Sequence, residues 1–254
     1  MQDNIIIDSI NSLEDSKINL SGKGNVLYIE DGVNLRGSNI SFNGNNSVVY
    51  LSKSNNPYVI NLVVNSNNVV FFGVDNYFNE RMVIIASECK HILIGGNCLF
   101  SFGVVIRNAD AHLIYDINTQ SRINDTQSIY IGDHVWIGQN TLLLKGTVIG
   151  SGSILGAGSV ISNKIVSSNS IWAGNPAKKI KDNIFWSGEC VHSWDKERTN
   201  KYSLKENSYP FSSDGKTISP ERFDRVLSSL KTSNERLDFL TKYFVGNVNR
   251  LFIA

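Results

Sequence analysis

Ile131-Gly-Asp-His-Val-Trp-Ile-Gly-Gln-Asn140 and Leu144-Lys-Gly-Thr-Val-Ile-Gly-Ser-Gly-Ser-Ile-Leu-Gly-Ala-Gly-Ser-Val160 repeat with a period of six residues. An aliphatic residue recurs at every sixth position, and these positions are Ile131, Ile137, Leu143, Ile149, Leu155 and Ile161. A helix would repeat its apolar positions every 3.6 residues and an ordinary strand every two, so neither explains the period. The pattern predicts a solenoid of short strands, in which three hexads close one turn and the aliphatic side chains stack inside.

The same spacing appears upstream, at Ile94, Phe100 and Ile106, and the next position in this series is His112. Residues 112–129 are mostly polar and carry no repeat. We therefore expect a loop that leaves the rigid coil there, which is a favourable place for functional residues.

Before residue 94 the pattern is weaker. Apolar runs such as Val26–Ile29 and Val48–Leu51 stand between clusters of Asn, Gly and Ser at irregular intervals, which predicts looser turns of the same solenoid. The chain has 31 asparagines, 21 of them before position 129, and this excess favours tight corners with left-handed backbone geometry.

The hexads end after Ile165, and the composition then changes. Ser219-Pro220-Glu221 is typical of a helix start, and a second helix is expected near Ser233. Apolar residues at helical spacing follow both starts, and they are Phe223, Val226, Leu227, Leu230, Leu237, Leu240 and Phe244. We predict two domains, a solenoid over 1–194 with a loop insertion at about 112–129, and a mostly helical extension over 195–254. The extension would pack on or cap the solenoid, or it would bind an acceptor or a neighbouring subunit.

The composition narrows the possible partners and compartments. A formal charge of +1 and a pI of about 7.7 give no general attraction to nucleic acid or anionic membrane. The start of the chain has no basic region before its short apolar run, and no 18 apolar residues run together. Three cysteines without C-x-x-C spacing favour a reducing compartment and offer no metal site. We expect a cytoplasmic protein with no transmembrane segment and no nucleic-acid partner.

The repeat, the interruption and the later Ala173-Gly-Asn-Pro-Ala-Lys178 follow in an order that resembles the hexapeptide-repeat acyltransferases. Within that family, two stretches are most similar to capsular polysaccharide O-acetyltransferases of the polysialic acid type. They are Val105-Ile-Arg-Asn-Ala-Asp-Ala-His112 with Ile114-Tyr-Asp116, and Lys181-Asp-Asn-Ile-Phe-Trp186 with His192-Ser193. The resemblance implies a left-handed parallel β-helix and a homotrimer with active sites between adjacent solenoids. It also implies acetyl-CoA as co-substrate and direct acetyl transfer to a sugar hydroxyl.

His112 is the first candidate for the catalytic base, because it ends a regular coil and imidazole can accept a proton near neutral pH. Asp110, Asn108 or Asp116 would orient its ring, unless they are solvated corner residues. Trp136 falls at an outward position of its hexad. It would stack on a sugar or on the pantetheine arm, or donate its N–H near the thioester oxygen, or be buried at a subunit interface.

The remaining candidates concern the coenzyme. Backbone amides around Gly156, Ala157, Ala173 and Gly174 would bind the pantetheine amides, since small residues let a ligand approach the main chain. Trp172 would pack on the adenine, and the resemblance adds Pro176 and Lys145. The basic residues Lys164, Lys178, Lys179 and Lys181 would attract the phosphates, or they form an ordinary solvated surface.

The leading hypothesis is therefore an enzyme, an O-acetyltransferase acting on a bacterial capsular or other surface polysaccharide or oligosaccharide. An N-acetyltransferase of an amino sugar or nucleotide sugar, and a noncatalytic glycan-binding solenoid, stay open as alternatives. The chain has no P-loop, no G-x-G-x-x-G and no G-x-S-x-G, so nucleotide hydrolysis, dinucleotide redox chemistry and serine hydrolase chemistry have no support.

Overall fold

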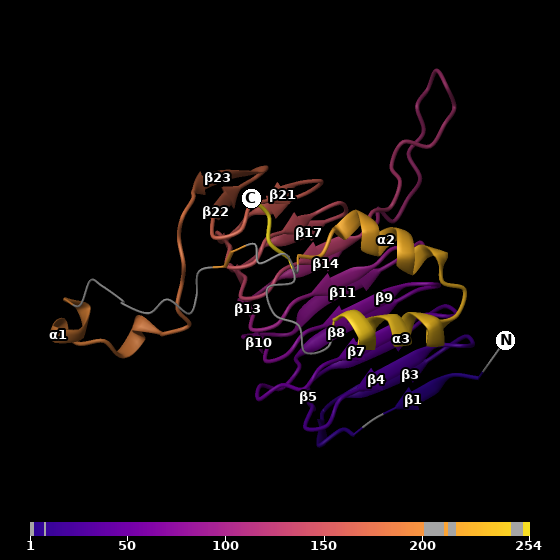
Figure 1. The fold of residues 1–254 in the computed structure, drawn as a ribbon, viewed down its shortest axis with the longest axis horizontal. Helices are drawn as coiled ribbons and strands as arrows, with labels where there is room; N and C mark the ends of the chain where they lie inside the picture. The colour runs from indigo at the N-terminus through magenta and orange to yellow at the C-terminus, as the bar shows by residue number, and fades with distance from the viewer. Residues whose placement is uncertain (1–2, 8, 201–210, 213–216, 245–250) are drawn as a thin grey trace.

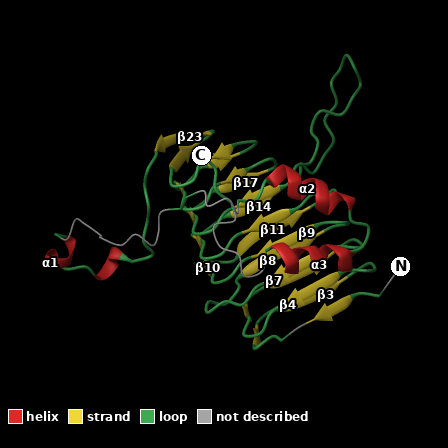
Figure 2. Cartoon of the chain, in the orientation of Figure 1, coloured by secondary structure: helices red, strands yellow, loops and turns green. Residues whose placement is uncertain are grey.

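The computed structural model describes residues 3–7, 9–200, 211–212, 217–244 and 251–254, and it confirms a left-handed parallel β-helix. The chain winds through three parallel sheets, which we call sheets I, II and III (Figure 1). A long loop projects from the coils, and two helices lie along one side of them (Figures 1 and 2).

Each sheet collects one strand from successive coils. Sheet I consists of β1 (Ile5–Ile7), β4 (Val26–Ile29), β7 (Val48–Leu51), β9 (Val69–Phe72), β12 (Ile92–Ile94), β15 (Ile129–Ile131), β18 (Val148–Ile149) and β21 (Ile165–Val166). Sheet II consists of β10 (Tyr77–Phe78), β13 (Leu99–Phe100), β16 (Trp136–Ile137), β19 (Ile154–Leu155), β22 (Ile171–Gly174) and the antiparallel β23 (Ala177–Lys181). Sheet III consists of β3 (Lys17–Leu20), β6 (Asn39–Phe42), β8 (Ile60–Val64), β11 (Met82–Ala86), β14 (Val105–Arg107), β17 (Leu142–Leu144) and β20 (Val160–Ile161). A separate pair joins β2 (Ser12–Glu14) and β5 (Asn34–Arg36).

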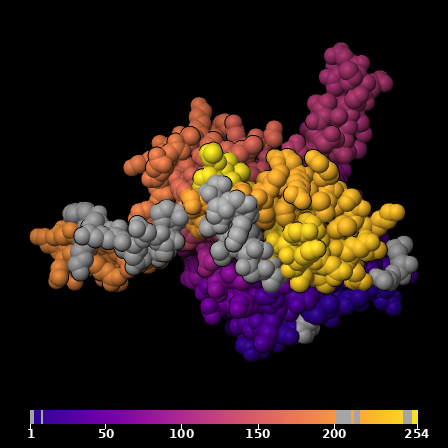
Figure 3. All heavy atoms as spheres, viewed as in Figure 1, coloured from indigo at the N-terminus to yellow at the C-terminus, as the bar shows by residue number. Residues whose placement is uncertain are grey.

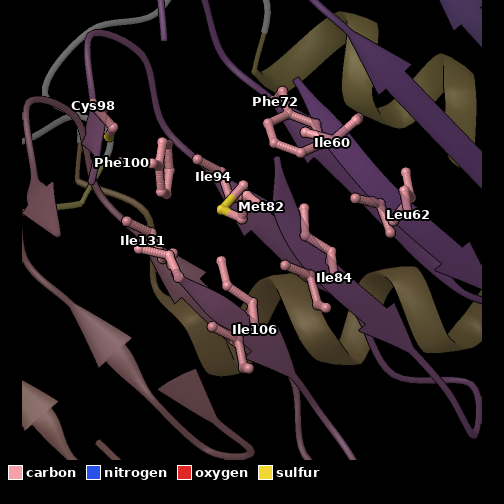
Figure 4. Close-up of a cluster of buried hydrophobic side chains, with 14 of the residues drawn as sticks. Ile60, Leu62, Phe72, Met82, Ile84, Ile94, Cys98, Phe100, Ile106 and Ile131 are labelled. Carbon is pink, nitrogen blue, oxygen red and sulfur yellow. The ribbon is translucent and has the colours of Figure 1, made fainter. Parts of the chain in front are cut away.

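The aliphatic positions of the repeat form the core inside the coils. All six hexad residues from Ile131 to Ile161 are at most 3% exposed. Upstream, Ile94, Phe100 and Ile106 continue the same stack, together with residues from the earlier coils such as Leu62 (Figure 4). One continuous ladder of buried side chains therefore stabilises the solenoid along the described coils.

The coils before and after the projecting loop differ in length. Beyond the loop, Tyr130 pairs with Val148 in the next coil, so that one turn consists of three hexads. In the early region Val26 pairs with Val48, and this turn is longer than three hexads. The early turns are thus regular and longer than hexapeptide turns, where the sequence indicated looser, irregular ones.

The helices cover the outer side of sheet I (Figure 3). Helix α2 (Pro220–Ser229) has Ser219 as its N-cap, and α3 (Ser233–Tyr243) starts with a capping box between Thr232 and Glu235. Their buried residues Leu227 and Leu240 pack with outward side chains of sheet I, which are Val26, Val48, Tyr50, Val69, Phe71, Leu93 and Tyr130. The helical extension is confirmed, and it packs against the side of the solenoid.

Two short helical segments, η1 (Val191–Ser193) and α1 (Lys196–Thr199), follow the last coil and extend away from it (Figure 1). No helix in the described ranges has the length and apolarity needed to cross a membrane.

Candidate active site

The projecting loop interrupts the coil between β14 and β15. Ile92 pairs with Ile129 across this break. Because the loop is inserted here, the two residues are farther apart in the sequence than paired residues of the early or the late turns. Asn124 is buried at the base of the loop, where its side-chain N–H groups donate to the His112 carbonyl (2.8 Å) and to Asp110 (3.0 Å). This amide therefore fixes the backbone of His112 at the point where the loop leaves the solenoid.

The side chain of His112 is exposed, and within the described residues it makes no hydrogen bond. The Asp110 carboxylate is bound by other residues, because its Oδ2 accepts from Lys145 Nζ (2.6 Å) and from Asn124 Nδ2. The hydrogen bond from Lys145 is the main reason why the pKa of Asp110 lies below its usual value. The imidazole is thus open to a substrate, and the orienting contact expected from Asp110 is absent within the described part of one chain.

The other two residues proposed to orient His112 have structural contacts. Asn108 is fully buried, its Oδ1 accepts from the Ser87 amide (2.9 Å), and its Nδ2 donates to the Ser87 carbonyl (3.3 Å). Asp116 caps the turn at the tip of the loop by accepting from the amide (2.8 Å) and the hydroxyl (3.1 Å) of Thr119. Both side chains are committed to backbone geometry, so we leave them out of the chemistry proposed below.

A second anchor holds the loop to the preceding coil. Arg122 donates through both terminal nitrogens to the carboxylate of Glu88 (2.9 and 2.8 Å), and Thr126 donates to the same carboxylate. These contacts, led by Arg122, lower the pKa of Glu88 to about 2. No local motif in the sequence marks Asn124, Arg122 or Glu88, because their partners in these contacts lie at least 12 positions away along the chain.

Trp136 lies on β16 in sheet II, and its side chain points outward with 39% of its surface exposed. Its indole N–H donates to Ser101 Oγ (3.3 Å). Trp186 returns from beyond the last coil and lies 6.0 Å from Trp136 between ring centroids. Trp186 itself stacks on His134 at 4.0 Å with nearly parallel rings. Two tryptophans therefore meet on one side of sheet II.

His134 is half-buried beneath Trp186. Its Nε2 is 3.0 Å from the Trp186 carbonyl, while the Trp186 indole donates to the His134 carbonyl (3.0 Å). Burial is the main cause that lowers the pKa of His134. This pair fastens the chain after the last coil to the corner before β16.

A cleft of about 1270 Å³ opens beside Trp136. Its floor is formed by β10, β13 and β16, and one wall is the segment from Trp186 to His192. His192 lines this cleft, although nothing around it in the sequence marked it as functional. His91, equally unmarked, is fully buried and accepts a hydrogen bond from the Val69 amide (3.2 Å).

His112 and Trp136 lie on different sides of the solenoid. His112 follows β14 of sheet III, at the corner that leads to sheet I, whereas Trp136 belongs to sheet II. A single chain therefore does not bring the two candidate residues to one place.

The small residues proposed for the coenzyme cluster at the end of the solenoid. Gly156 and Ala157 form the turn after β19, Ala173 and Gly174 end β22, and Pro176 follows a cis peptide bond in the hairpin to β23. Several of the amides are already used, since Gly156 N–H donates to the Trp172 carbonyl (2.8 Å) and Gly174 N–H to Ser159 Oγ (3.1 Å).

Trp172 faces the inside of the coil. It pairs with Leu155 in register, packs against the buried core, and donates its indole N–H to Ser170 Oγ (3.0 Å). This position gives Trp172 a structural role at the end of the core, while its side chain stays partly exposed.

The lysines proposed for the phosphates are divided between two places. Lys178 is exposed on β23, next to Lys179, which pairs with Asp182 (3.1 Å). Lys164 is exposed in the turn between β20 and β21, on the same edge of the solenoid as Lys145.

Comparison with known proteins agrees with the fold and the order of these features. The family model described as bacterial transferase hexapeptide (six repeats) matches residues 128–163. The chain belongs to the hexapeptide-repeat acyltransferases.

Two relatives within this family are polysialic acid O-acetyltransferases. The protein of that name from Neisseria meningitidis is 49% identical over 110 residues, which are 43% of this chain and 51% of the relative. The one from Escherichia coli O1:K1 / APEC is 38% identical over 104 residues, 41% of this chain and 33% of the relative. The matches thus span about half or less of these relatives.

Two solved structures match over a longer range. The polySia specific acetyltransferase NeuO has a TM-score of 0.69 and 30% identity, with 78% of this chain and 95% of NeuO covered. The polysialic acid O-acetyltransferase OatWY has a TM-score of 0.64 and 29% identity, with 76% and 94% covered.

Proposed function

We propose that this protein transfers an acetyl group from acetyl-CoA to a hydroxyl of a bacterial surface polysaccharide, with His112 as the general base. The observation that carries the proposal is the placement of His112: its backbone is pinned by Asn124 while its imidazole is open at the base of the loop. The names of the similar proteins support polysaccharide O-acetylation as the reaction class.

In this mechanism the imidazole of His112 takes the proton from the acceptor hydroxyl as its oxygen attacks the thioester carbon. The carbon–sulfur bond then breaks, and the imidazolium returns the proton to the leaving thiolate. Acetyl is thereby exchanged between sulfur and oxygen with no covalent enzyme intermediate. Asp110 contributes indirectly, because its contacts with Lys145 and Asn124 hold the segment that carries His112.

Trp136 is the second residue that we assign to the site. Its exposed ring offers an apolar face to the pantetheine arm or the acceptor sugar, and its N–H direction is set by Ser101. Because Trp136 and His112 are on different sides of one chain, the complete site requires a second copy.

We therefore propose a homotrimer in which sheet III of one copy faces sheet II of the next across a groove that stays open to the substrates. Sheet I is excluded from such contacts along the early coils, because α2 and α3 already cover it. The exposed loop carries apolar side chains that a neighbouring copy would cover, namely Leu113, Ile114, Tyr115, Ile117 and Ile123. This packing would place the base of one loop beside Trp136 of the adjacent copy.

The coenzyme is placed in the same groove, toward the end of the solenoid. Ala157 and Gly174 are exposed there, and Lys178 would contact a phosphate. Gly156 acts through its size, because a Cβ on it would meet Ala173 Cβ at 2.7 Å and push the last coils apart. Lys164 offers further positive charge at the edge that bears the loop, where Lys145 is paired with Asp110.

We assign residues 1–194 to the catalytic solenoid and 195–254 to the extension, and we place the protein in the cytoplasm. Three cysteines without C-x-x-C spacing fit a reducing compartment.

The test is acetyl transfer to a panel of capsular oligosaccharides, followed by the mass increase of one acetyl group. We expect His112→Ala to lower kcat by about 10²- to 10⁴-fold with an unchanged thermal midpoint. Asn118→Ala is the matched control, because Asn118 lies at the exposed tip of the same loop and only its amide is used. Release of the product acetyl by hydroxylamine identifies an ester. Full activity of His112→Ala would refute the assigned base.

A further inference from the structure

The cleft beside Trp136 carries a row of exposed aromatic side chains. Tyr77 on β10 pairs with Leu99 on β13, and Leu99 pairs with Trp136 on β16, so all three point outward in one line. Tyr77 is 47% exposed, and Phe102 beside the middle strand is 50% exposed. Two strand spacings separate Tyr77 from Trp136, or roughly 9–10 Å, a distance that a short oligosaccharide spans.

Polar groups stand between these rings. Asn79 and Asn97 present exposed side-chain amides to the same cleft, and Ser101 orients Trp136. Apolar faces combined with a few amide donors and acceptors suit a sugar chain, whose rings have C–H faces and hydroxyl edges.

The charge of the cleft restricts the occupant further. Asp75, Asp133 and Glu189 line it, and no lysine or arginine does so among the residues that the structure describes. Glu189 is paired with Arg198 (3.3 Å), so the like charges that a chain with a carboxylate on every sugar would meet here are those of Asp75 and Asp133.

We propose that this cleft binds the acceptor glycan, with sugar rings on Tyr77 and Trp136, and that the bound segment is uncharged. Trp136 stands in the middle of sheet II, so the acceptor would lie on the side of the early coils and the coenzyme on the side of β19 and β22. The inference rests on the proposed function only in naming the occupant as the acceptor.

The experiment measures binding without transfer, so that it is independent of catalysis. Uncharged homo-oligosaccharides of glucose, galactose and N-acetylglucosamine are titrated into the full chain without coenzyme, next to an oligosialic acid, and tryptophan emission is followed. We expect an uncharged oligosaccharide to bind with little dependence on salt, because no ion pair is involved.

The variants decide whether the aromatic row is responsible. Tyr77→Ala should raise Kd for that oligosaccharide about tenfold or more, whereas Tyr77→Phe should keep it within about twofold, because the ring provides the contact. Tyr243→Ala is the matched control, since Tyr243 is a similarly exposed tyrosine (43%) on α3.

A separate variant tests whether the carboxylates of the cleft weaken the binding of a charged glycan. Asp75→Asn should tighten binding of the oligosialic acid. Glu189 is left unchanged because it pairs with Arg198 (3.3 Å), and Asp133 because it accepts from the Gly96 amide (2.6 Å). Tighter binding of oligosialic acid than of every uncharged oligosaccharide by the unmodified protein would overturn the proposal. So would an unchanged Kd in Tyr77→Ala, or the absence of binding by the uncharged set. Binding as expected without any acetyl transfer would instead refute the proposed function and leave the cleft assignment intact.

Discussion

The coils before and after the projecting loop use the same core with different corners. Before the loop, successive turns carry the chain from Val26 to Val48 and from Val48 to Val69. After it, the turn from Tyr130 to Val148 is shorter and consists of three hexads. The inward ladder is buried throughout, so the extra residues of the early turns are placed in longer strands and wider corners. Coil length is therefore free to vary as long as the ladder is kept.

The corners also differ in what holds them. In the early coils, side chains bond from coil to coil: Asn25 Oδ1 accepts from the Ser47 amide (3.0 Å), and Ser47 Oγ accepts from the Asn68 amide (2.9 Å). In the later coils, hydroxyls take over from asparagine amides and bond both within their own corner and to the next coil, as Ser153 does with the Gly150 and Ser167 carbonyls (both 2.8 Å). The loop that carries His112 leaves the solenoid where one type of coil gives way to the other.

Removal of residues 217–254 should have the largest effect, and it should fall on the early coils. The deletion uncovers Val48, Phe71 and the rest of the apolar outer side of sheet I. Each buried anchor lost costs about 2–5 kcal/mol, so we expect aggregation or loss of cooperative unfolding. Soluble yield and hydrogen exchange check this, with exchange rising before the loop more than after it. Leu227→Ala should stay folded with reduced stability; a deletion variant as stable as the whole chain would contradict the role of the helices.

Matched cavities in the two ladders test whether the core is equivalent in both regions. Leu62 and Leu143 are both 0% exposed. We expect Leu62→Ala and Leu143→Ala each to lower the free energy of unfolding by about 2–5 kcal/mol, measured by denaturant titration. A loss confined to one of the two variants would show that the coils do not share one cooperative core.

The sequence predicted the later coils well, because each side there consists of one hexad and the period is visible by inspection. The period of six is not visible in the early coils, because extra corner residues shift each aliphatic position. A fixed spacing therefore does not identify Leu62 or Ile84 as core residues. The excess of asparagine was still informative. Among the described residues, seven of the 13 non-glycine residues with positive φ are asparagines, as tight corners require.

The candidate site was only partly predictable for a related reason. His112 stands out because the hexad repeat ends there. Trp136 stands out because its position in the hexad places its side chain on the outside of the coil. Asn124, Arg122 and Trp186 act through partners far away in the sequence, such as Glu88 and His134, so no local pattern reveals them. Their positions follow from the way the loop and the last segment fold back on the coils.

His91 should make the early region sensitive to acid. It is fully buried beside Asp224, Lys90 and Arg236, and burial lowers its pKa from 6.5 to about 3. Between pH 6.5 and 3 the unfolded chain therefore binds a proton at this histidine and the folded chain does not. The free energy of unfolding falls as the pH drops through this range. At pH 5.5 the loss should approach about 1.4 kcal/mol. Denaturant titrations at several pH values check this, and His91→Asn should flatten the slope; an equal slope in that variant would assign it to other groups.

The smallest difference concerns one asparagine with positive φ from a corner of each region. Asn46 (φ +59°) lies in the early region, where its Nδ2 donates to the Lys231 carbonyl (2.7 Å) and its Oδ1 accepts from the Ser233 amide (2.7 Å). Asn140 (φ +56°) lies after the loop, and its side chain is exposed. Asn46 therefore ties α3 to the coil, while Asn140 is needed for backbone geometry alone.

Glycine at each position separates these two roles, because it keeps the left-handed backbone and removes the side chain. Asn46→Gly should cost about 1 kcal/mol through the lost hydrogen bonds, and Asn140→Gly less than about 0.5 kcal/mol. Alanine at position 140 should cost about 1 kcal/mol, since its Cβ is strained at positive φ. Thermal midpoints of the three variants measure the order. If Asn140→Gly were as costly as Asn46→Gly, the later corners would also depend on side-chain contacts, and the contrast between the two kinds of coil would reduce to their length.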